Sequence, residues 1–284
     1  MAFGLSTAAL ISSMAAAGPL SIENSPRPQV RPQITTVSQE VPVVEVQASV
    51  AGFESWIEDF KARAQSQGIS MALLDQSFQG VRYDKDVVRR DRNQSEFTKT
   101  IWDYLDSAAS DARVRNGRKA LEENRAVLAE IEGRYGVPAQ IVAAIWGLES
   151  AYGAVRGDNN VIEALATLAY DGRRGSFFEE QLIAAFKILQ NGDVTARNMT
   201  GSWAGAMGHT QFIPTSYLSF AVDFRGDGKR DIWSNDPTDA LASTASYLKE
   251  AGWITGQPWG MEVTLPDGFD YALTGHPTKK SPPE

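Results

Sequence analysis

The sequence predicts a mainly α-helical protein, and three observations support this fold class. Apolar residues recur at helical spacing within residues 53–60, where Phe53, Trp56, Ile57 and Phe60 share one face. The same spacing returns within residues 97–105, at Phe97, Ile101, Trp102 and Leu105. Strand-like alternation is scarce before Met261-Glu-Val-Thr-Leu265, which predicts a minor β element; residues 43–50 are a further candidate strand.

Two further helices are expected in the middle of the chain. One is predicted over residues 119–135, with Gly136 placed to end it as a C-cap. The next begins near Pro138, a residue that suits the first turn of a helix because its missing N–H is not needed there. This second helix is apolar almost all round, through Ile141, Val142, Ile145 and Leu148, so we expect it to be buried.

Composition excludes several classes of function. The 284-residue chain has a formal net charge of -8 and no long Lys/Arg block, which argues against a nucleic-acid partner. The absence of cysteine excludes disulfides, thiol nucleophiles, cysteine-bound metals and the lipid-anchoring cysteine of a bacterial lipoprotein. With only His209 and His276 in the sequence, a multi-histidine metal centre is excluded as well, and no cofactor is expected.

The N-terminal residues read as a targeting segment followed by a tether. Residues 2–17 are uncharged and apolar, are shorter than the roughly 20 residues that span a membrane, and end in three alanines. We therefore predict a secretory signal peptide over 1–17, although no Lys or Arg precedes the apolar run; the alternative is an ordinary disordered tail. Residues 18–50, rich in Pro, Gln, Val and Ser, predict a disordered linker, and 51–284 form the remaining domain.

Glu149 is the candidate for chemistry. It follows Val142 and Ile145 on the same helical stripe, where a carboxylate is unfavourable unless it is paired or protonated. Loss of hydration would raise its pKa, as a general acid requires. Taken alone, such a residue is more often a structural ion pair or a surface carboxylate. Gly147 and Gly153, each about 1 kcal/mol less favourable than Ala in a helix, suggest close approach by a ligand or another backbone, and a C-cap is an equal alternative for Gly153.

A second informative segment spans residues 201–214. It holds several glycines together with a Trp, a Met, a Phe and a Gln, a composition that does not favour one continuous helix. Such a loop can present backbone N–H groups and flat apolar faces to a sugar ring. A packed turn between helices is the alternative interpretation.

Together these segments resemble a known family. Glu149-Ser-Ala-Tyr-Gly153 is followed by Gly205-Ala-Met-Gly-His-Thr-Gln-Phe212, and between them lie Ala164–Ala169, Arg173-Arg174 and Phe177-Phe178. In this order and at this spacing the chain resembles, over about residues 53–275, the lytic murein transglycosylases of the membrane-bound B type. The resemblance implies a lysozyme-like catalytic domain with extra N-terminal helices.

The resemblance also implies a mechanism with one carboxylate. Glu149 would protonate the β-1,4 glycosidic oxygen between N-acetylmuramic acid and N-acetylglucosamine. It would then act as base on the muramyl C6 hydroxyl, which closes onto C1 and leaves a 1,6-anhydro end. Ser150 would hydrogen-bond near the acid and Gln211 would contact the substrate, while the remaining groove candidates are Tyr152, Met207 and Phe212. The implied partner is the peptidoglycan glycan strand, the location is the periplasm, and we expect a monomer.

Two departures from the family pattern carry expectations of their own. Some relatives hold calcium in a loop matching residues 223–234, but here Arg225 takes the third loop position and Ser234 the twelfth, where oxygen ligands belong. We therefore expect no calcium site and an ion cluster between Arg225 and an Asp. The family domain also normally continues past residues 265–273 with a Tyr-Asn-containing motif, so the C-terminal part of the catalytic domain is expected to be missing.

Two alternative functions remain open at this stage. A hydrolytic muramidase of the goose-lysozyme type would need a second acidic group near Glu149 to activate water, and Asp158, Glu163 and Asp171 are available in the sequence. A non-catalytic peptidoglycan-binding protein would need no working acid at all.

Overall fold

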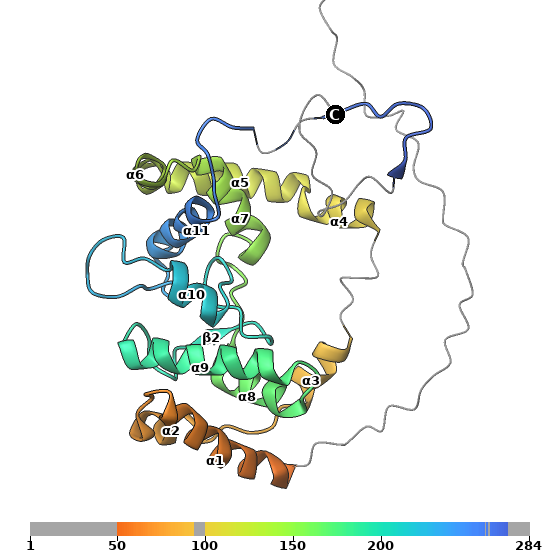
Figure 1. The fold of residues 1–284 in the computed structure, drawn as a ribbon. Helices are drawn as coiled ribbons and strands as arrows, with labels where there is room; N and C mark the ends of the chain where they lie inside the picture. The colour runs from red at the N-terminus through yellow and green to blue at the C-terminus, as the bar shows by residue number, and fades with distance from the viewer. Residues whose placement is uncertain (1–49, 94–99, 259, 261, 272–284) are drawn as a thin grey trace, which may run out of the picture. The chain divides into compact units, whose positions relative to one another are not determined.

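The computed structural model describes residues 50–93, 100–258, 260 and 262–271 (Figure 1). Within these residues the chain is mainly α-helical, as predicted. The predicted signal peptide, nearly all of the linker, and residues 43–49 of one candidate strand lie outside the described residues, while Val50 begins a helix. The helices are α1 (Val50–Ser66), α2 (Met71–Ser77), α3 (Lys85–Arg92), α4 (Ile101–Ala108), α5 (Asp111–Glu123), α6 (Arg125–Tyr135), α7 (Ala139–Ser150), α8 (Val161–Asp171), α9 (Gly175–Asn191), α10 (Pro214–Phe220) and α11 (Thr238–Glu250).

One hydrophobic core forms around α8 and α9. The predicted apolar face of α1 is confirmed, because Phe53, Ile57 and Phe60 are all buried there. Phe60 packs against Phe186 of α9, with ring centroids 5.9 Å apart. This core fixes α8 and α9 side by side (Figure 1) and supports the loop that follows α9.

A second hydrophobic core joins α5, α6, α7 and α11. Its fully buried side chains include Leu128, Ile131, Val142 and Leu241. Contacts of α7 with α5, α6 and α11 hold the helix from several sides. The site described below therefore lies on a helix that its neighbours keep in place.

The long helix predicted over residues 119–135 is interrupted. Asn124 separates α5 from α6, and its side-chain amide donates to the carbonyl oxygen of Ala120 at 2.9 Å. Asparagine breaks helices in this way because its side chain competes with the backbone for hydrogen bonds. The predicted end at Gly136 is confirmed: this residue is left-handed, with φ 72°, and it caps α6.

Helix α4 forms where the sequence predicts one, but its apolar face is not covered by the described residues. Ile101, Trp102 and Leu105 are 59%, 42% and 42% exposed, whereas Phe97 lies outside the described residues. Thr100 caps the helix by accepting the N–H of Asp103. The apolar spacing therefore predicts the helix correctly, but it does not predict that these side chains are exposed.

The β element lies elsewhere than predicted. Residues 262–265 form no strand, and Met261 is outside the described residues. Instead β1 (Asn159–Asn160) pairs antiparallel with β2 (Thr200–Gly201), with Asn159 opposite Gly201. This short ladder brings the chain leaving α7 next to the segment 201–214. In the part of the chain that is described, no helix has the length and apolar composition to cross a membrane.

Candidate active site

Helix α7 carries Glu149 on its open side. The helix starts one residue later than expected, because Pro138 is extended and precedes the first turn. Its buried side consists of Val142, Ala143, Trp146, Gly147 and Ser150. The expectation that Glu149 lies among buried residues is wrong: the residue is exposed, and only half-buried Ile145 accompanies it. An apolar helix surface can line a cavity as well as a core, and here it does both.

Glu149 faces a cavity of about 340 Å³ that three segments enclose. Helix α7 supplies one wall, the loop 210–213 with the start of α10 supplies the second, and α11 the third. The lining residues are Ile145, Glu149, Thr210, Gln211, Phe212, Ile213, Ser216, Thr244 and Tyr247. Partial loss of hydration within these walls raises the pKa of the Glu149 carboxyl, although the residue as a whole stays exposed.

Glu149 is the one carboxylate among the described residues that line this cavity. The three other acids considered from sequence lie elsewhere. Glu163 accepts the backbone N–H of Arg82 at 2.9 Å, and Asp171 accepts the hydroxyl of Tyr83 at 3.2 Å. Asp158 is exposed and does not line the cavity. The arrangement thus supplies a single proton-transfer group with no carboxylate partner.

Gln211 and Phe212 meet Glu149 in the cavity. Gln211 is left-handed, with φ 53°, and its amide nitrogen donates to the carbonyl oxygens of Arg156 at 3.0 Å and Gly208 at 2.9 Å. These bonds hold the amide group at the cavity wall. Phe212 is 8% exposed and contributes a mostly covered apolar edge.

Ser150 and Met207 do not reach the cavity. Ser150 is 1% exposed; its hydroxyl donates to the carbonyl oxygen of His209 and accepts the N–H of Gly153 at 3.0 Å. Met207 is fully buried, and its backbone exchanges two hydrogen bonds with Phe212, of 2.9 and 3.0 Å, which close the turn that projects Gln211. Both residues lie buried beneath the cavity walls and do not line the cavity.

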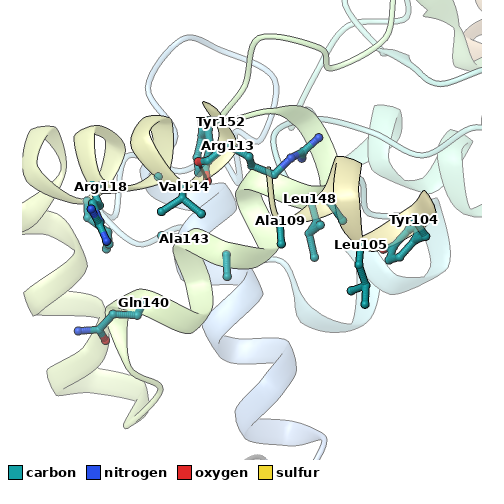
Figure 2. A pocket seen from close by; sticks show the side chains of 14 residues that line it. Tyr104, Leu105, Ala109, Arg113, Val114, Arg118, Gln140, Ala143, Leu148 and Tyr152 are labelled. Atoms are coloured by element: carbon teal, nitrogen blue, oxygen red, sulfur yellow. Dashed lines mark hydrogen bonds between the residues drawn. The ribbon is translucent and has the colours of Figure 1, made fainter. Parts of the chain in front are cut away.

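Tyr152 belongs to a different cavity, on another side of α7. It has a left-handed backbone, with φ 60°, and its hydroxyl donates to the carbonyl oxygen of Arg113 at 3.0 Å. Figure 2 shows this mainly apolar space of about 430 Å³, which Leu105 and Leu148 also line. A Cβ at Gly147 would lie 2.5 Å from the Tyr152 ring, so the close approach expected at this glycine is made by Tyr152 and not by a ligand.

Sequence reasoning missed the contribution of α11 to the site. Tyr247 is 41% exposed beside the cavity, and its ring packs edge-on against Phe212 and Phe220 at 6.2 and 5.0 Å. Thr244 lies one turn earlier on the same helix. Nothing in the local pattern of α11 marks these positions, because they join the site only through the packing of α11 against α7.

The segment 223–234 is held together by its own side chains. The carboxylate of Asp223 accepts the N–H groups of Gly226, Asp227 and Gly228, which lowers its pKa. Arg225 pairs with Glu130 of α6 at 2.7 Å, so the expected Arg225–Asp cluster is wrong in its partner.

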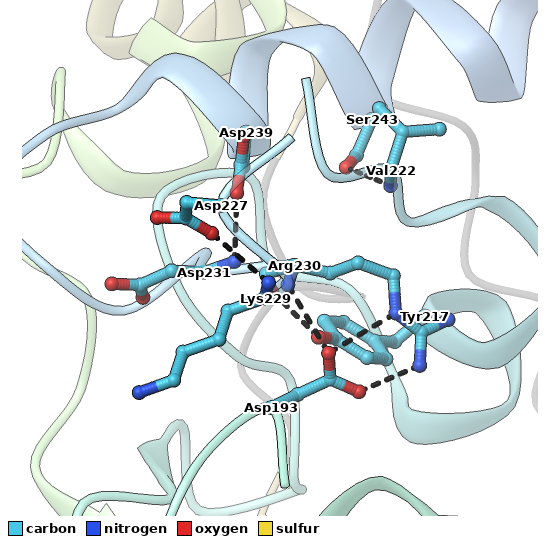
Figure 3. A network of polar contacts seen from close by, with 9 residues as sticks. All are labelled: Asp193, Tyr217, Val222, Asp227, Lys229, Arg230, Asp231, Asp239 and Ser243. Atoms are coloured by element: carbon cyan, nitrogen blue, oxygen red, sulfur yellow. Dashed lines mark hydrogen bonds and ion pairs between the residues drawn. The ribbon is translucent and has the colours of Figure 1, made fainter. Parts of the chain in front are cut away.

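A partly buried network of polar contacts continues from this segment (Figure 3). Arg230 pairs with Asp193 at 2.6 Å, while the carboxylate of Asp239 accepts the N–H of Asp231 at 2.9 Å. These oxygens already accept internal donors, and no described group of three or more His, Asp or Glu residues is arranged to hold a metal. Arg225, at the third position of the loop 223–234, is paired with Glu130. The expected lack of calcium binding stays a prediction.

Comparison with known proteins places this geometry in a family. The sequence model of the transglycosylase SLT domain matches residues 52–283. Membrane-bound lytic murein transglycosylase B of Escherichia coli is 40% identical over 141 residues, which are 48% of this chain and 38% of that protein. The chain thus spans well under half of this curated relative.

Solved structures agree with the sequence match. SltB3 from Pseudomonas aeruginosa, in complex with NAG-NAM-pentapeptide, is 56% identical with a TM-score of 0.75; the match covers 78% of this chain and 59% of that chain. Escherichia coli lytic transglycosylase Slt35, in complex with calcium, is 32% identical with a TM-score of 0.64, covering 71% of this chain and 64% of that chain. These matches confirm the mainly α, lysozyme-like fold. Since the family model spans most of its residues, this chain belongs to the transglycosylase SLT domain family.

Proposed function

We propose that this protein is a peptidoglycan lytic transglycosylase, which cleaves the β-1,4 bond between N-acetylmuramic acid and N-acetylglucosamine and leaves 1,6-anhydro ends. The observation that carries the proposal is the cavity with one carboxylate of raised pKa, Glu149. Ordinary glycosidases need two carboxyl groups, one as acid and one as nucleophile or base. A reaction in which the sugar's own C6 hydroxyl attacks C1 needs one group that serves first as acid and then as base.

Glu149 alone provides both proton transfers that the reaction needs. Its protonated carboxyl donates the proton to the glycosidic oxygen as the bond from that oxygen to C1 breaks. The resulting carboxylate then takes the proton of the C6 hydroxyl while the C6 oxygen bonds to C1. A raised pKa favours the protonated state required for the first step. Gln211 and Tyr247 line the same cavity and supply an amide and an aromatic face to the sugar.

The hydrolytic alternative is less well supported by the positions of the other acids. None of Asp158, Glu163 and Asp171 lines the cavity, and loss of hydration is the cause that raises the pKa of Glu149, without a neighbouring carboxylate. The non-catalytic alternative gives no role to the raised pKa of Glu149 or to its position at the cavity.

We also propose the partner, the location and the assembly state of the protein. The partner is the glycan strand of peptidoglycan, which the similarity to membrane-bound lytic murein transglycosylase B of Escherichia coli supports. The location is the periplasm, reached through a signal peptide over residues 1–17. The protein acts as a monomer and uses no cofactor or calcium.

Digestion of isolated cell-wall sacculi followed by mass spectrometry tests the activity. The chain should release fragments with anhydromuramyl ends, and Glu149→Gln should lower the rate by about 100-fold or more, as expected for loss of a general acid. Glu250→Gln is the matched control, because Glu250 is exposed at the end of α11 and does not line the cavity. Reducing muramic-acid ends would establish a hydrolase instead. Equal rates for the natural chain and Glu149→Gln would exclude catalysis by this residue.

A further inference from the structure

His209 lies buried between the end of α7 and the loop that carries Gln211. It is 4% exposed. The indole N–H of Trp146 donates to its Nδ1 at 3.1 Å, and the two rings meet edge-on with centroids 5.7 Å apart. On the other side of the ring, Nε2 lies 2.8 Å from the carbonyl oxygen of Ser234.

These two partners determine where the proton of His209 resides. An indole N–H only donates and a carbonyl oxygen only accepts, so Nδ1 must carry the lone pair and Nε2 the hydrogen. Nη1 of Arg156 lies 3.1 Å from Nε2 but donates to the carbonyl oxygens of Trp233 and Ser234. The ring is therefore neutral and held in a single tautomer.

The charges around the ring favour the neutral state. Burial lowers the pKa of His209 most, and the Arg156 guanidinium lowers it further. The hydrogen bond to Ser234 and the more distant carboxylates of Asp231 and Asp236 oppose this without reversing it. A protonated ring would also turn Nδ1 into a donor that faces the donor of Trp146.

The same residue contacts α7 and its end at three positions around Glu149. Trp146 precedes Glu149 by three residues and bonds the ring. Ser150 follows Glu149 and donates its hydroxyl to the carbonyl oxygen of His209. Gly153 leaves space for the ring, since a Cβ there would lie 2.4 Å from Nδ1.

The contacts continue to the opposite wall of the cavity. Gln211 follows His209 by two residues, and its amide nitrogen donates to the carbonyl oxygen of Arg156. The guanidinium of Arg156 in turn bonds the Ser234 carbonyl oxygen that His209 contacts, as well as the side chain of Asn235. The distance from Glu149 to Gln211 thus depends on one closed network with His209 at its centre.

We infer that His209 is a positioning residue for the proposed reaction: its buried imidazole fixes the end of the acid-bearing helix to the loop that carries Gln211. This rests on the proposed function of Glu149. The role follows from the contacts of this ring with Trp146, Ser150 and Ser234. Misplacement of a catalytic group by about 1 Å lowers rates by roughly 100-fold, so small shifts of α7 matter.

Kinetics of His209 variants distinguish positioning from mere stability. His209→Leu should lower kcat by roughly 10- to 100-fold with little change in KM. It should also move the alkaline limb of the pH–rate profile to lower pH, because a displaced Glu149 is better hydrated and its pKa falls. His209→Asn, whose side-chain oxygen can accept the Trp146 N–H, should recover part of kcat.

Tyr217→Phe is the structural control, since Tyr217 is fully buried away from the cavity and its hydroxyl donates to the carbonyl oxygen of Arg230. It should lower Tm without changing kcat or the pH profile. If His209→Leu behaves in the same way at a temperature where it is folded, the positioning role is excluded.

A nitrogen NMR experiment tests the inference on the unmutated chain and without any activity. Only two histidines occur in the sequence, so ¹⁵N-histidine labelling gives two ring systems to assign. One should show a hydrogen on Nε2 and none on Nδ1, and the midpoint of its titration should lie below the ordinary histidine value of 6.5. Mixed tautomers, or titration of both rings near the ordinary pKa, would overturn the inference. If the tautomer is locked but Glu149→Gln leaves the rate unchanged, the proposed function fails and the catalytic part of the inference fails with it, while the contacts of the ring with Trp146 and Ser234 stand.

Discussion

Substitution of Gly153 by alanine is expected to loosen the turn behind the acid by a collision that the structure specifies. Gly153 has φ 83°, and an alanine Cβ there would lie 2.4 Å from Nδ1 and 2.5 Å from Cε1 of His209. Real Cβ atoms do not approach so closely, so the ring must move and its bond with Trp146 must break. A buried donor left without its partner costs about 1–3 kcal/mol. The left-handed backbone adds about 1–2 kcal/mol for any residue with a Cβ.

Gly192 provides a matched control for the backbone contribution. It has φ 82°, ends α9, and has no atom within 4 Å of a built Cβ. Gly192→Ala should therefore lower the free energy of unfolding only by the cost of the left-handed backbone, and Gly153→Ala should lower it by about 1–3 kcal/mol more. For a domain of this size the difference corresponds to roughly 2–12 °C in Tm.

Urea denaturation followed by circular dichroism measures both variants against the natural chain. Equal destabilisation of the two variants would refute the collision argument, because it would show that the ring of His209 moves aside without loss.

Three further outcomes are expected. The pKa of Glu149 is raised in the folded protein, so folding favours the protonated carboxyl. The contribution of Glu149 to stability is therefore complete below the ordinary pKa of 4.5 and is lost as pH rises through the raised pKa. Glu149→Gln should accordingly raise Tm at about pH 8 but not at about pH 4. Tyr247→Ala removes the exposed ring beside Phe212 and should weaken binding of glycan fragments in calorimetry by about tenfold, whereas unchanged affinity would exclude a sugar contact. Arg225→Ala breaks an exposed pair with Glu130 and should change the unfolding free energy by less than about 1 kcal/mol, and neither EDTA nor added calcium should alter the Tm of the natural chain.

Local sequence patterns predicted the elements that depend on neighbouring residues. The apolar face of α1 and the left-handed end of α6 at Gly136 follow from short-range spacing and from the conformational freedom of glycine. The break at Asn124 was missed because the helical spacing continues through it, and only the side-chain hydrogen bond reveals the interruption.

The candidate site was predictable only in part. Glu149 and Gln211 were found from their segments, and the structure brings them to one cavity. Which side of α7 opens to that cavity could not be read from an apolar helix, since Ile145 lines a pocket and Val142 lines the core. Tyr247 was missed because its place depends on how α11 packs, about a hundred residues further along the chain.

The left-handed residues near the acid have a consequence for engineering. Among the described residues, the non-glycine positions with positive φ are Ala151, Tyr152 and Gln211, at 50°, 60° and 53°. Two directly follow the helix that bears Glu149, and the third lines its cavity. Ala151→Gly is a candidate stabilising substitution, because glycine removes about 1 kcal/mol of left-handed backbone strain. The same change makes the backbone more flexible two residues from Glu149. At this position a gain in Tm is therefore expected to come with a loss of kcat.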